Sequence, residues 1–171
     1  RILFRVRSER IPPGLDDKVL TSWNGLVLAA FAEAARVLGD ATYREVAEKT
    51  TAFLKREVWR DGRLLHTYKR GIARIDGMVE DYTFTGLGFV EMYRLTGDFS
   101  YLDFARDLCE VLVREFHDPE NGGFFETTAS GEKLLVRQKS LFDEATPSGN
   151  GSGAQLAWWL SRYYEREEWA E

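Results

Sequence analysis

Hydrophobic and polar positions change character from one predicted helix to the next. Residues 21 to 38 carry only two charged side chains, whereas residues 41 to 58 carry seven and gather their apolar side chains on one stripe. A helix that is apolar nearly all round is buried on most sides, and a helix with a single apolar stripe is covered on one side only. The pattern therefore predicts an inner helix followed by an outer helix.

The same pair of helices recurs further along the chain. Residues 82 to 95 carry two charged side chains, and residues 98 to 116 again show a single apolar stripe among many charges. A third apolar helix begins within residues 146 to 164. We therefore expect two related helical hairpins and the first half of a third.

Each predicted hairpin has a very short turn. Gly39-Asp40 stands between the first two helices and recurs as Gly97-Asp98, 58 residues later. Glycine suits the position that follows a helix, and aspartate suits the position that caps the next one.

The connections between hairpins are much longer than these turns. Residues 59 to 78 contain RLLHTY and GIARI, and residues 118 to 145 contain GGFFETT and EKLLVRQ. Each connection predicts a small β-hairpin, because two short apolar runs flank a polar turn. Both connections lead from an outer helix to the next inner one, so they lie at one end of the assembly, where we expect the functional site.

These elements predict an all-α fold, a partial α/α toroid of the six-hairpin barrel type with short β-hairpins in its long connections. Closing such a ring takes about six hairpins at this repeat length, and an incomplete stack leaves the flanks of its end helices exposed. Residues 1 to 171 are therefore interpreted as a segment of a single barrel domain, about two and a half hairpins, completed by further sequence or by another copy of the chain. A self-contained small helical bundle is the alternative.

The composition of the chain argues against several classes of function. A net charge of −5 with a pI near 5.2 argues against nucleic-acid binding, which needs clustered Lys and Arg. A single cysteine, Cys109, with two histidines, His66 and His117, cannot build a disulfide or a Cys/His metal cluster. We expect no metal and no cofactor.

No apolar run approaches the roughly 20 residues that span a bilayer, and the first ten residues carry arginines without the apolar stretch of a signal peptide. We therefore expect no membrane partner and a cytoplasmic protein.

Three polar clusters stand at the starts of the three inner helices. They comprise Asp16, Asp17, Lys18, Trp23 and Asn24, then Glu80, Asp81 and Tyr82, then Asp143, Glu144, Thr146, Ser148 and Asn150. Helix capping alone explains carboxylates and hydroxyls at such positions. Aromatic rings beside carboxylates and amides are also what a polyhydroxylated ligand requires, so a sugar-like ligand is the functional interpretation.

Two carboxyl groups from different hairpins could act as general acid and base, since hydrolysis of a glycosidic bond needs such a pair. The candidates are Asp81 with Asp143 or Glu144. His66 lies in a predicted strand, on the same face as Tyr68, and is a candidate for proton transfer or ligand binding. A packed or solvated loop histidine is the alternative for His66.

Four strings carry a family resemblance: DDKVLTSWNGL at 16 to 26, GRLLHTY at 62 to 68, VEDYTF at 79 to 84 and DEATPSGN at 143 to 150. Together they resemble the C-terminal half of the thioredoxin-domain-containing, spermatogenesis-associated protein family. The resemblance implies a six-hairpin α/α barrel related to N-acylglucosamine 2-epimerases and six-hairpin glycosidases. It also implies that the thioredoxin-like domain of the family has no counterpart in this chain.

Residues at matching motif positions are implied as site candidates by this resemblance. They are Asp16, Asp17, Lys18, Trp23, Asn24, Asp81, Tyr82, Pro147, Ser148, Gly149 and Asn150. Glu144 and Gly151 depart from the family pattern, which usually has Gly and Ser there. The predicted inner helices contain no histidine, so an epimerase mechanism does not map onto them.

Two functions from different classes follow from these observations. The first is binding or processing of a carbohydrate, with hydrolase or isomerase activity left open for the full-length protein. The second is a non-catalytic protein-interaction module that accompanies a thioredoxin-like domain.

Overall fold

The computed structural model describes residues 1 to 169. Six α-helices and four short strands make up this part of the chain. In chain order they are α1 (Ile2–Ser8), β1 (Val19–Leu20), α2 (Thr21–Leu38), α3 (Ala41–Phe53), β2 (Trp59–Arg60), β3 (Arg63–Lys69), β4 (Ile72–Asp76), α4 (Val79–Thr96), α5 (Phe99–Phe116) and α6 (Gly149–Tyr164). A π-helical turn, Leu54–Val58, extends α3, and a 3₁₀ turn, Glu167–Trp169, follows α6.

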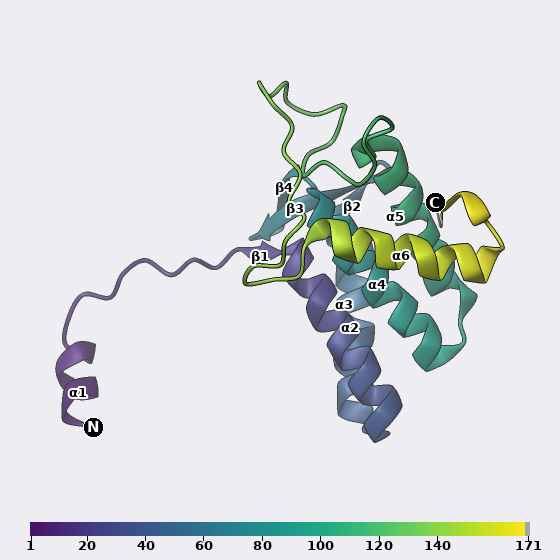
Figure 1. Cartoon of the computed structure of the whole chain (residues 1–171). Coiled ribbons are helices and arrows are strands. Elements are labelled where there is room, and N and C mark those ends of the chain that lie inside the picture. Colours follow the sequence, from purple (N-terminus) through teal and green to yellow (C-terminus); the bar gives the residue numbers. More distant parts are fainter. Residues whose placement is uncertain (170–171) are drawn as a thin grey trace.

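Helices α2 to α6 pack together in two layers, whereas α1 lies apart from them (Figure 1). Helix α4 lies at the centre and packs against α2, α5 and α6, while α3 packs against α2. Helices α2, α4 and α6 are thus the predicted inner helices, and α3 and α5 are the outer ones, which confirms the α/α-toroid fold class. Fully buried side chains between the layers include Leu28, Leu54, Phe89, Leu108, Leu112 and Leu156.

Both short turns adopt the predicted conformation. Gly39 and Gly97 end α2 and α4 with φ of 69° and 73°, a left-handed conformation that favours glycine. Asp40 then caps α3 by accepting the Thr42 N–H at 2.8 Å. Asp98 caps α5 in the same way.

Two glycines let α2 and α4 approach closely. A Cβ atom on Gly25 would lie 2.5 Å from the backbone nitrogen of Thr85. A Cβ atom on Gly88 would lie 2.9 Å from the carbonyl oxygen of Gly25. The two backbones therefore touch at a point where no side chain fits, and this contact fixes the crossing of the first two inner helices.

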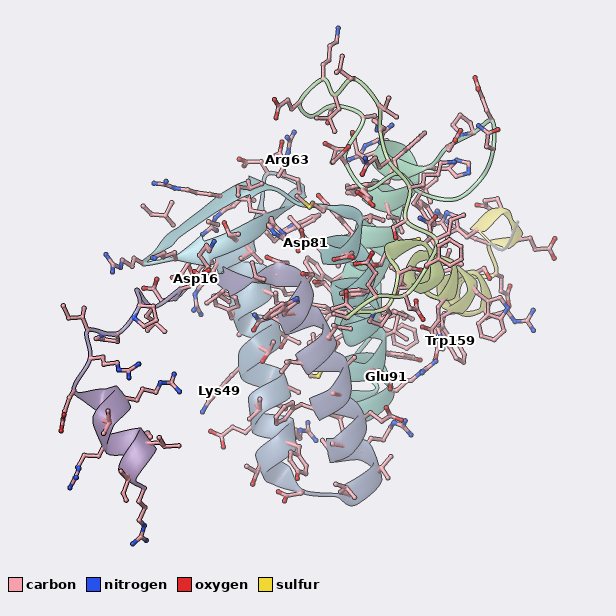
Figure 2. The ribbon with its side chains drawn as sticks, turned by 60° about the vertical axis from the view of Figure 1, so that its left-hand side comes forward. Asp16, Lys49, Arg63, Asp81, Glu91 and Trp159 are labelled. Atoms are coloured by element: carbon pink, nitrogen blue, oxygen red, sulfur yellow. The ribbon has the colours of Figure 1, made fainter. Side chains whose placement is uncertain are left out.

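A polar clamp ties the inner helices together in their second halves. Arg94 of α4 lies 3.9 Å from the ring centroid of Trp159 on α6 and pairs with Glu91. Arg36 of α2 lies 3.8 Å from the other oxygen of Glu91. Figure 2 shows Glu91 well along the helices, away from Asp16 and Asp81 near the sheet.

The first long connection forms the predicted β-hairpin. Strands β3 and β4 pair antiparallel, with Leu65 opposite Asp76 and Lys69 opposite Ile72. Strand β1 pairs with β3 as well, and β2 pairs with the start of β3 through a tight turn. The sheet thus joins the entry to α2 with the connection between α3 and α4.

The β-hairpin predicted within residues 118 to 145 is wrong, because this range contains no strand. One isolated bridge joins His117 to Phe124 at its start. Scattered backbone bonds, such as the Glu126 N–H to the Gln138 carbonyl, and side chains hold the rest. Arg137 donates to the carbonyls of Glu115 and Thr127. An apolar run such as EKLLVRQ predicts a strand only where a partner strand is in reach.

Helix α2 is less buried than its composition predicts. Trp23 is 59% exposed, and Val27 and Val37 on the same side of the helix are exposed too. Helix α2 lies at one edge of the inner layer, and within residues 1 to 169 nothing covers that side. At the opposite edge, Trp158 of α6 is 47% exposed.

Three further features complete the description of residues 1 to 169. Helix α1, for which no element was predicted, stands apart from the helical layers at the end of an extended segment (Figure 1). Cys109 is fully buried, and burial raises the pKa of its thiol to about 12. No helix in the described part of the chain is long and apolar enough to cross a membrane.

Replacing Gly25 by Ala tests the close crossing of α2 and α4. We expect a loss of about 1–3 kcal/mol in the free energy of unfolding, because the new methyl group meets backbone atoms that cannot move aside. Urea unfolding of the two proteins measures this loss in free energy. Gly14→Ala is the control, since a Cβ there meets no atom within 4 Å. Equal stability of Gly25→Ala and wild type would contradict the described crossing.

Candidate functional site

The N-terminal ends of α2, α4 and α6 meet beside the sheet. The Ser22 N–H at the start of α2 donates to Asp81 at the start of α4. A Cβ atom on Gly149, the first residue of α6, would lie 2.5 Å from Val79 Cγ1 on α4. We call these three first turns, together with β3, the rim. The three predicted clusters do therefore gather at one end of the layer.

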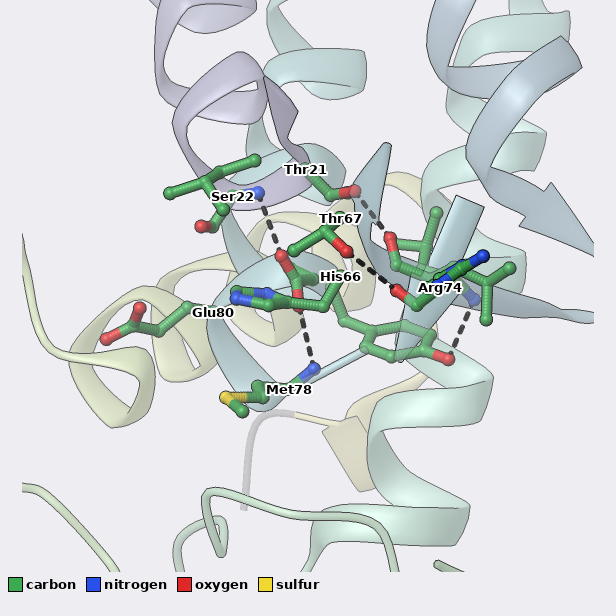
Figure 3. A network of polar contacts seen from close by, with 12 residues as sticks. Thr21, Ser22, His66, Thr67, Arg74, Met78 and Glu80 are labelled. Atoms are coloured by element: carbon green, nitrogen blue, oxygen red, sulfur yellow. Dashed lines mark hydrogen bonds and ion pairs between the residues drawn. The ribbon is translucent and has the colours of Figure 1, made fainter. Parts of the chain in front are cut away.

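A buried carboxylate organises the rim (Figure 3). Asp81 is 0% exposed, and its Oδ1 accepts the Ser22 N–H at 2.8 Å. Its Oδ2 accepts the Met78 N–H at 2.8 Å and lies 2.9 Å from Nδ1 of His66. Carboxylates are stabilised at helix N-termini by unpaired N–H groups, and Asp81 serves two helices at once.

Three successive residues of β3 are fixed to the helices. The Leu64 N–H donates to Tyr82 Oη at 2.9 Å, and the Leu65 carbonyl accepts from Thr21 Oγ1 at 2.5 Å. His66, the next residue, bonds to Asp81. The position of the His66 imidazole is therefore fixed in two ways. The backbone of β3 is bonded to the helices, and the ring itself is bonded to Asp81.

His66 is the titratable group that this arrangement presents. Its side chain is 22% exposed, and within residues 1 to 169 only its Nδ1 makes a hydrogen bond. The bond to Asp81 raises the pKa of His66, although burial opposes the shift, and the charges of Asp81 and Glu80 add to the rise. The imidazole thus holds its proton more tightly than a free histidine.

Glu80 brings a second titratable group to the same place. Burial raises the pKa of its carboxyl, and the charges of Asp81, Glu126 and Glu144 raise it further. Glu144, which precedes α6 in the chain, is therefore close enough to act on Glu80. Figure 3 shows the His66 ring and the Glu80 side chain pointing toward the same side.

Several predicted ligand residues instead hold the protein together. Asn150 accepts the Phe124 N–H at 2.6 Å and donates to the Phe124 and Ser140 carbonyls, each at 2.9 Å. Ser148 caps α6 by accepting the Gly151 N–H at 3.0 Å. These side chains fix the loop before α6 and offer little to a ligand.

Tyr82 is likewise structural. Its ring is buried against Phe116, and burial raises the pKa of its hydroxyl to about 12. Asp81, predicted as an acid or base, has both oxygens occupied and no exposed surface. Its position suits the orientation of His66 rather than contact with a ligand.

In the first cluster, some side chains are paired with neighbouring groups and others are exposed to solvent. Asp17 pairs with Lys69 on β3, and Lys18 lies 3.3 Å from Asp16. Asn24 donates to the Leu20 carbonyl at 2.8 Å. The Trp23 side chain makes the large exposed apolar surface of this cluster, beside the exposed charges of Asp16 and Lys18.

Asp143 and Glu144 are both exposed. Asp143 accepts the Ser148 N–H at 2.8 Å, whereas Glu144 acts electrostatically on Glu80. The structure therefore brings Glu144, of these two, toward Glu80.

Within residues 1 to 169, a cavity of about 600 Å³ is not shared by the three clusters. This cavity is lined by Asn150 and Trp158, and neither Asp17 nor Asp81 lines it. Among the residues that the structure describes, no group of three His, Cys, Asp or Glu side chains is placed to hold a metal ion. The rim is therefore an open surface between the ends of the helices.

The sequence did not reveal the pairing of His66 with Asp81 or the role of Glu80. The two members of the pair lie 15 residues apart, on a strand and a helix whose contact follows from the fold. A usable signal was the presence of both residues in motif strings, GRLLHTY and VEDYTF, that flank one connection.

The sequence of the chain is similar to those of known proteins. No protein-family model matches it. It is 31% identical over 180 residues to human spermatogenesis-associated protein 20, covering 99% of this chain and 23% of that protein. The chain thus spans about a quarter of the length of the curated relatives it matches. This homology confirms the family resemblance.

Solved structures confirm the fold alone, since their sequences are distant. Cellobiose 2-epimerase from Bacillus thermoamylovorans has a TM-score of 0.72 at 20% identity, covering 89% of this chain and 41% of that one. An inactive α-1,6-mannanase variant of Salegentibacter sp. in complex with α-1,6-mannotriose has a TM-score of 0.69 at 16% identity, covering 88% and 44%.

Replacing Asp81 by Ala tests its structural role. We expect a loss of about 3–5 kcal/mol in unfolding free energy, because two N–H groups and an imidazole lose a buried acceptor. Asp143→Ala is the matched control, since this exposed carboxylate also accepts one backbone N–H; its cost should be about 1 kcal/mol or less. Equal costs in denaturant unfolding would contradict the role given to Asp81.

The pH dependence of stability tests the His66 contact. Because the pKa of His66 is raised on folding, its contribution is complete below the unfolded pKa and disappears as pH rises through the folded pKa. Wild type should therefore exceed His66→Gln in unfolding free energy at about pH 5, and the difference should shrink toward about pH 9. A difference that grows with pH would contradict the contact.

Proposed function

We propose, from the homology with a segment of spermatogenesis-associated protein 20 and from the α/α-barrel fold, that this chain forms part of the wall of a carbohydrate-binding barrel. The ligand would lie at the rim. The observation that carries the proposal is the convergence there of an exposed indole, a histidine and two carboxyl groups, those of Trp23, His66, Glu80 and Glu144.

The chemistry of these groups suits a sugar. An exposed indole offers an apolar face to a pyranose ring, and imidazole and carboxyl groups exchange hydrogen bonds with its hydroxyls. Two proteins of similar fold are connected with sugars: one is a cellobiose 2-epimerase, and one is in complex with α-1,6-mannotriose. These likenesses support the ligand class by analogy of fold.

We also propose that the inner layer continues on both sides of the described helices. Beyond its first turn, the exposed apolar side of α2, with Val27 and Val37, has the character of a helix interface without its partner. The solved barrels are more than twice as long as the part that this chain covers. Further helical hairpins, as in those barrels, are the partner that fits this side of α2.

The second candidate function, a protein-interaction module, draws support from a different observation. Tyr82, Ser148 and Asn150 use their polar groups within the protein, so fewer groups remain for a ligand than the sequence predicts. If the rim binds no ligand, the exposed apolar surfaces remain as the feature that would bind a partner protein.

A thermal-shift titration with cellobiose and α-1,6-mannotriose distinguishes the two functions. A sugar at one hundred times its Kd should raise the unfolding free energy by about 2.7 kcal/mol. Trp23→Ala should weaken binding by about tenfold, equivalent to about 1.4 kcal/mol. Trp158→Ala is the matched control, because this half-exposed indole lies further along α6. Absence of a shift with both sugars would favour the interaction module.

A further inference from the structure

His66 has one ring nitrogen engaged and one available. Nδ1 lies 2.9 Å from Asp81 Oδ2, an oxygen that also accepts the Met78 N–H. The other Asp81 oxygen accepts the Ser22 N–H. A carboxylate oriented by two backbone donors can only accept from the imidazole, so Nδ1 carries a hydrogen in every protonation state. Nε2 is then the atom that gains and loses a proton.

The available nitrogen belongs to the open side of the rim. The His66 side chain keeps 22% of its surface exposed while Asp81 is fully buried behind it. Figure 3 shows the ring reaching toward the side where the Glu80 side chain lies. A protonated Nε2–H there is a charged donor, and hydrogen bonds from charged donors are the stronger ones.

We propose, relying on the carbohydrate site proposed above, that His66 contacts the ligand by donating its protonated Nε2–H to an oxygen of an uncharged sugar, and that Asp81 is the positioning residue that fixes the imidazole for this contact. The ligand class follows from the surrounding charges. Glu80, Glu126 and Glu144 outnumber the nearby Lys18, and this balance of charge disfavours sugar phosphates and sugar acids.

The same geometry sets the direction of the pH dependence. The charged groups that act on His66 are Asp81 and Glu80 of α4, which raise its pKa, and Lys18 before β1, which lowers it. Binding is therefore strongest below the pKa of His66 and weakens as pH rises through it, because the neutral ring has no hydrogen on Nε2.

Calorimetric titration of the protein with cellobiose and with α-1,6-mannotriose, from about pH 6 to about pH 9, tests the proposal. The Kd of wild type for the bound sugar should rise by about tenfold or more across this range, as expected when a bond from a charged donor is lost. His66→Gln should bind more weakly at the acid end, with a Kd that is flat with pH. His117→Gln, which changes the other histidine, should behave as wild type does.

The outcomes separate this proposal from the one it rests on. If wild type binds neither sugar at any pH, both proposals are overturned. If a sugar binds with a pH-independent Kd, or if His66→Gln matches wild type, the carbohydrate site stands and the role of His66 is overturned.

Nitrogen chemical shifts of the His66 ring test the positioning role without any ligand. Above the pKa of His66, the neutral ring should carry its proton on Nδ1, and the titrating atom should be Nε2. A neutral ring protonated on Nε2 would mean that Asp81 does not accept from Nδ1, and it would overturn the assignment of Asp81.

Discussion

One buried carboxylate connects most of what is distinctive in this structure. Asp81 accepts N–H groups from the first turn of α2 and from the entry to α4, and it bonds to the imidazole of His66 on β3. A buried charge is tolerated only when its oxygens are fully bonded. Asp81 can therefore be accommodated only if the two helix ends and the strand are all in place, and it thereby fixes the geometry of the rim.

The helical layers supply the rigid support for this arrangement. The backbones of α2 and α4 touch at Gly25 and Gly88, and the clamp around Glu91 and Arg94 joins the same inner layer in its second half. Helix ends held at both levels cannot slide past one another without breaking close packing. The position of His66 thus depends on packing far from the rim as well as on its own hydrogen bonds.

Much of the fold could be predicted from the sequence, because charge patterning and capping are local. The alternation of apolar and striped helices gave the two layers, and Gly39 and Gly97 marked helix ends. The predicted strands after α5 were wrong, because irregular backbone bonds together with the side chains of Arg137 and Asn150 satisfy the backbone there instead. The exposure of α2 was also missed, since composition shows that a surface is apolar and not which neighbour covers it.

The location of the candidate site could be predicted from the sequence, but the roles of its individual residues could not. Clusters at helix starts located the rim, yet a carboxylate that caps two helices and one that contacts a ligand have the same sequence signature. Burial and bonding partners separate them: Asp81 and Asn150 are buried and bonded within the protein, whereas His66 and Trp23 keep exposed surface.

Amide hydrogen exchange at Ser22 and Met78 tests the central role of Asp81 most directly, because these N–H groups bond to its side chain. In wild type we expect both amides to exchange far more slowly than in an unstructured chain, and Asp81→Asn should speed both more than it speeds the amides of α5. Fast exchange of both amides in the wild-type protein would contradict the account.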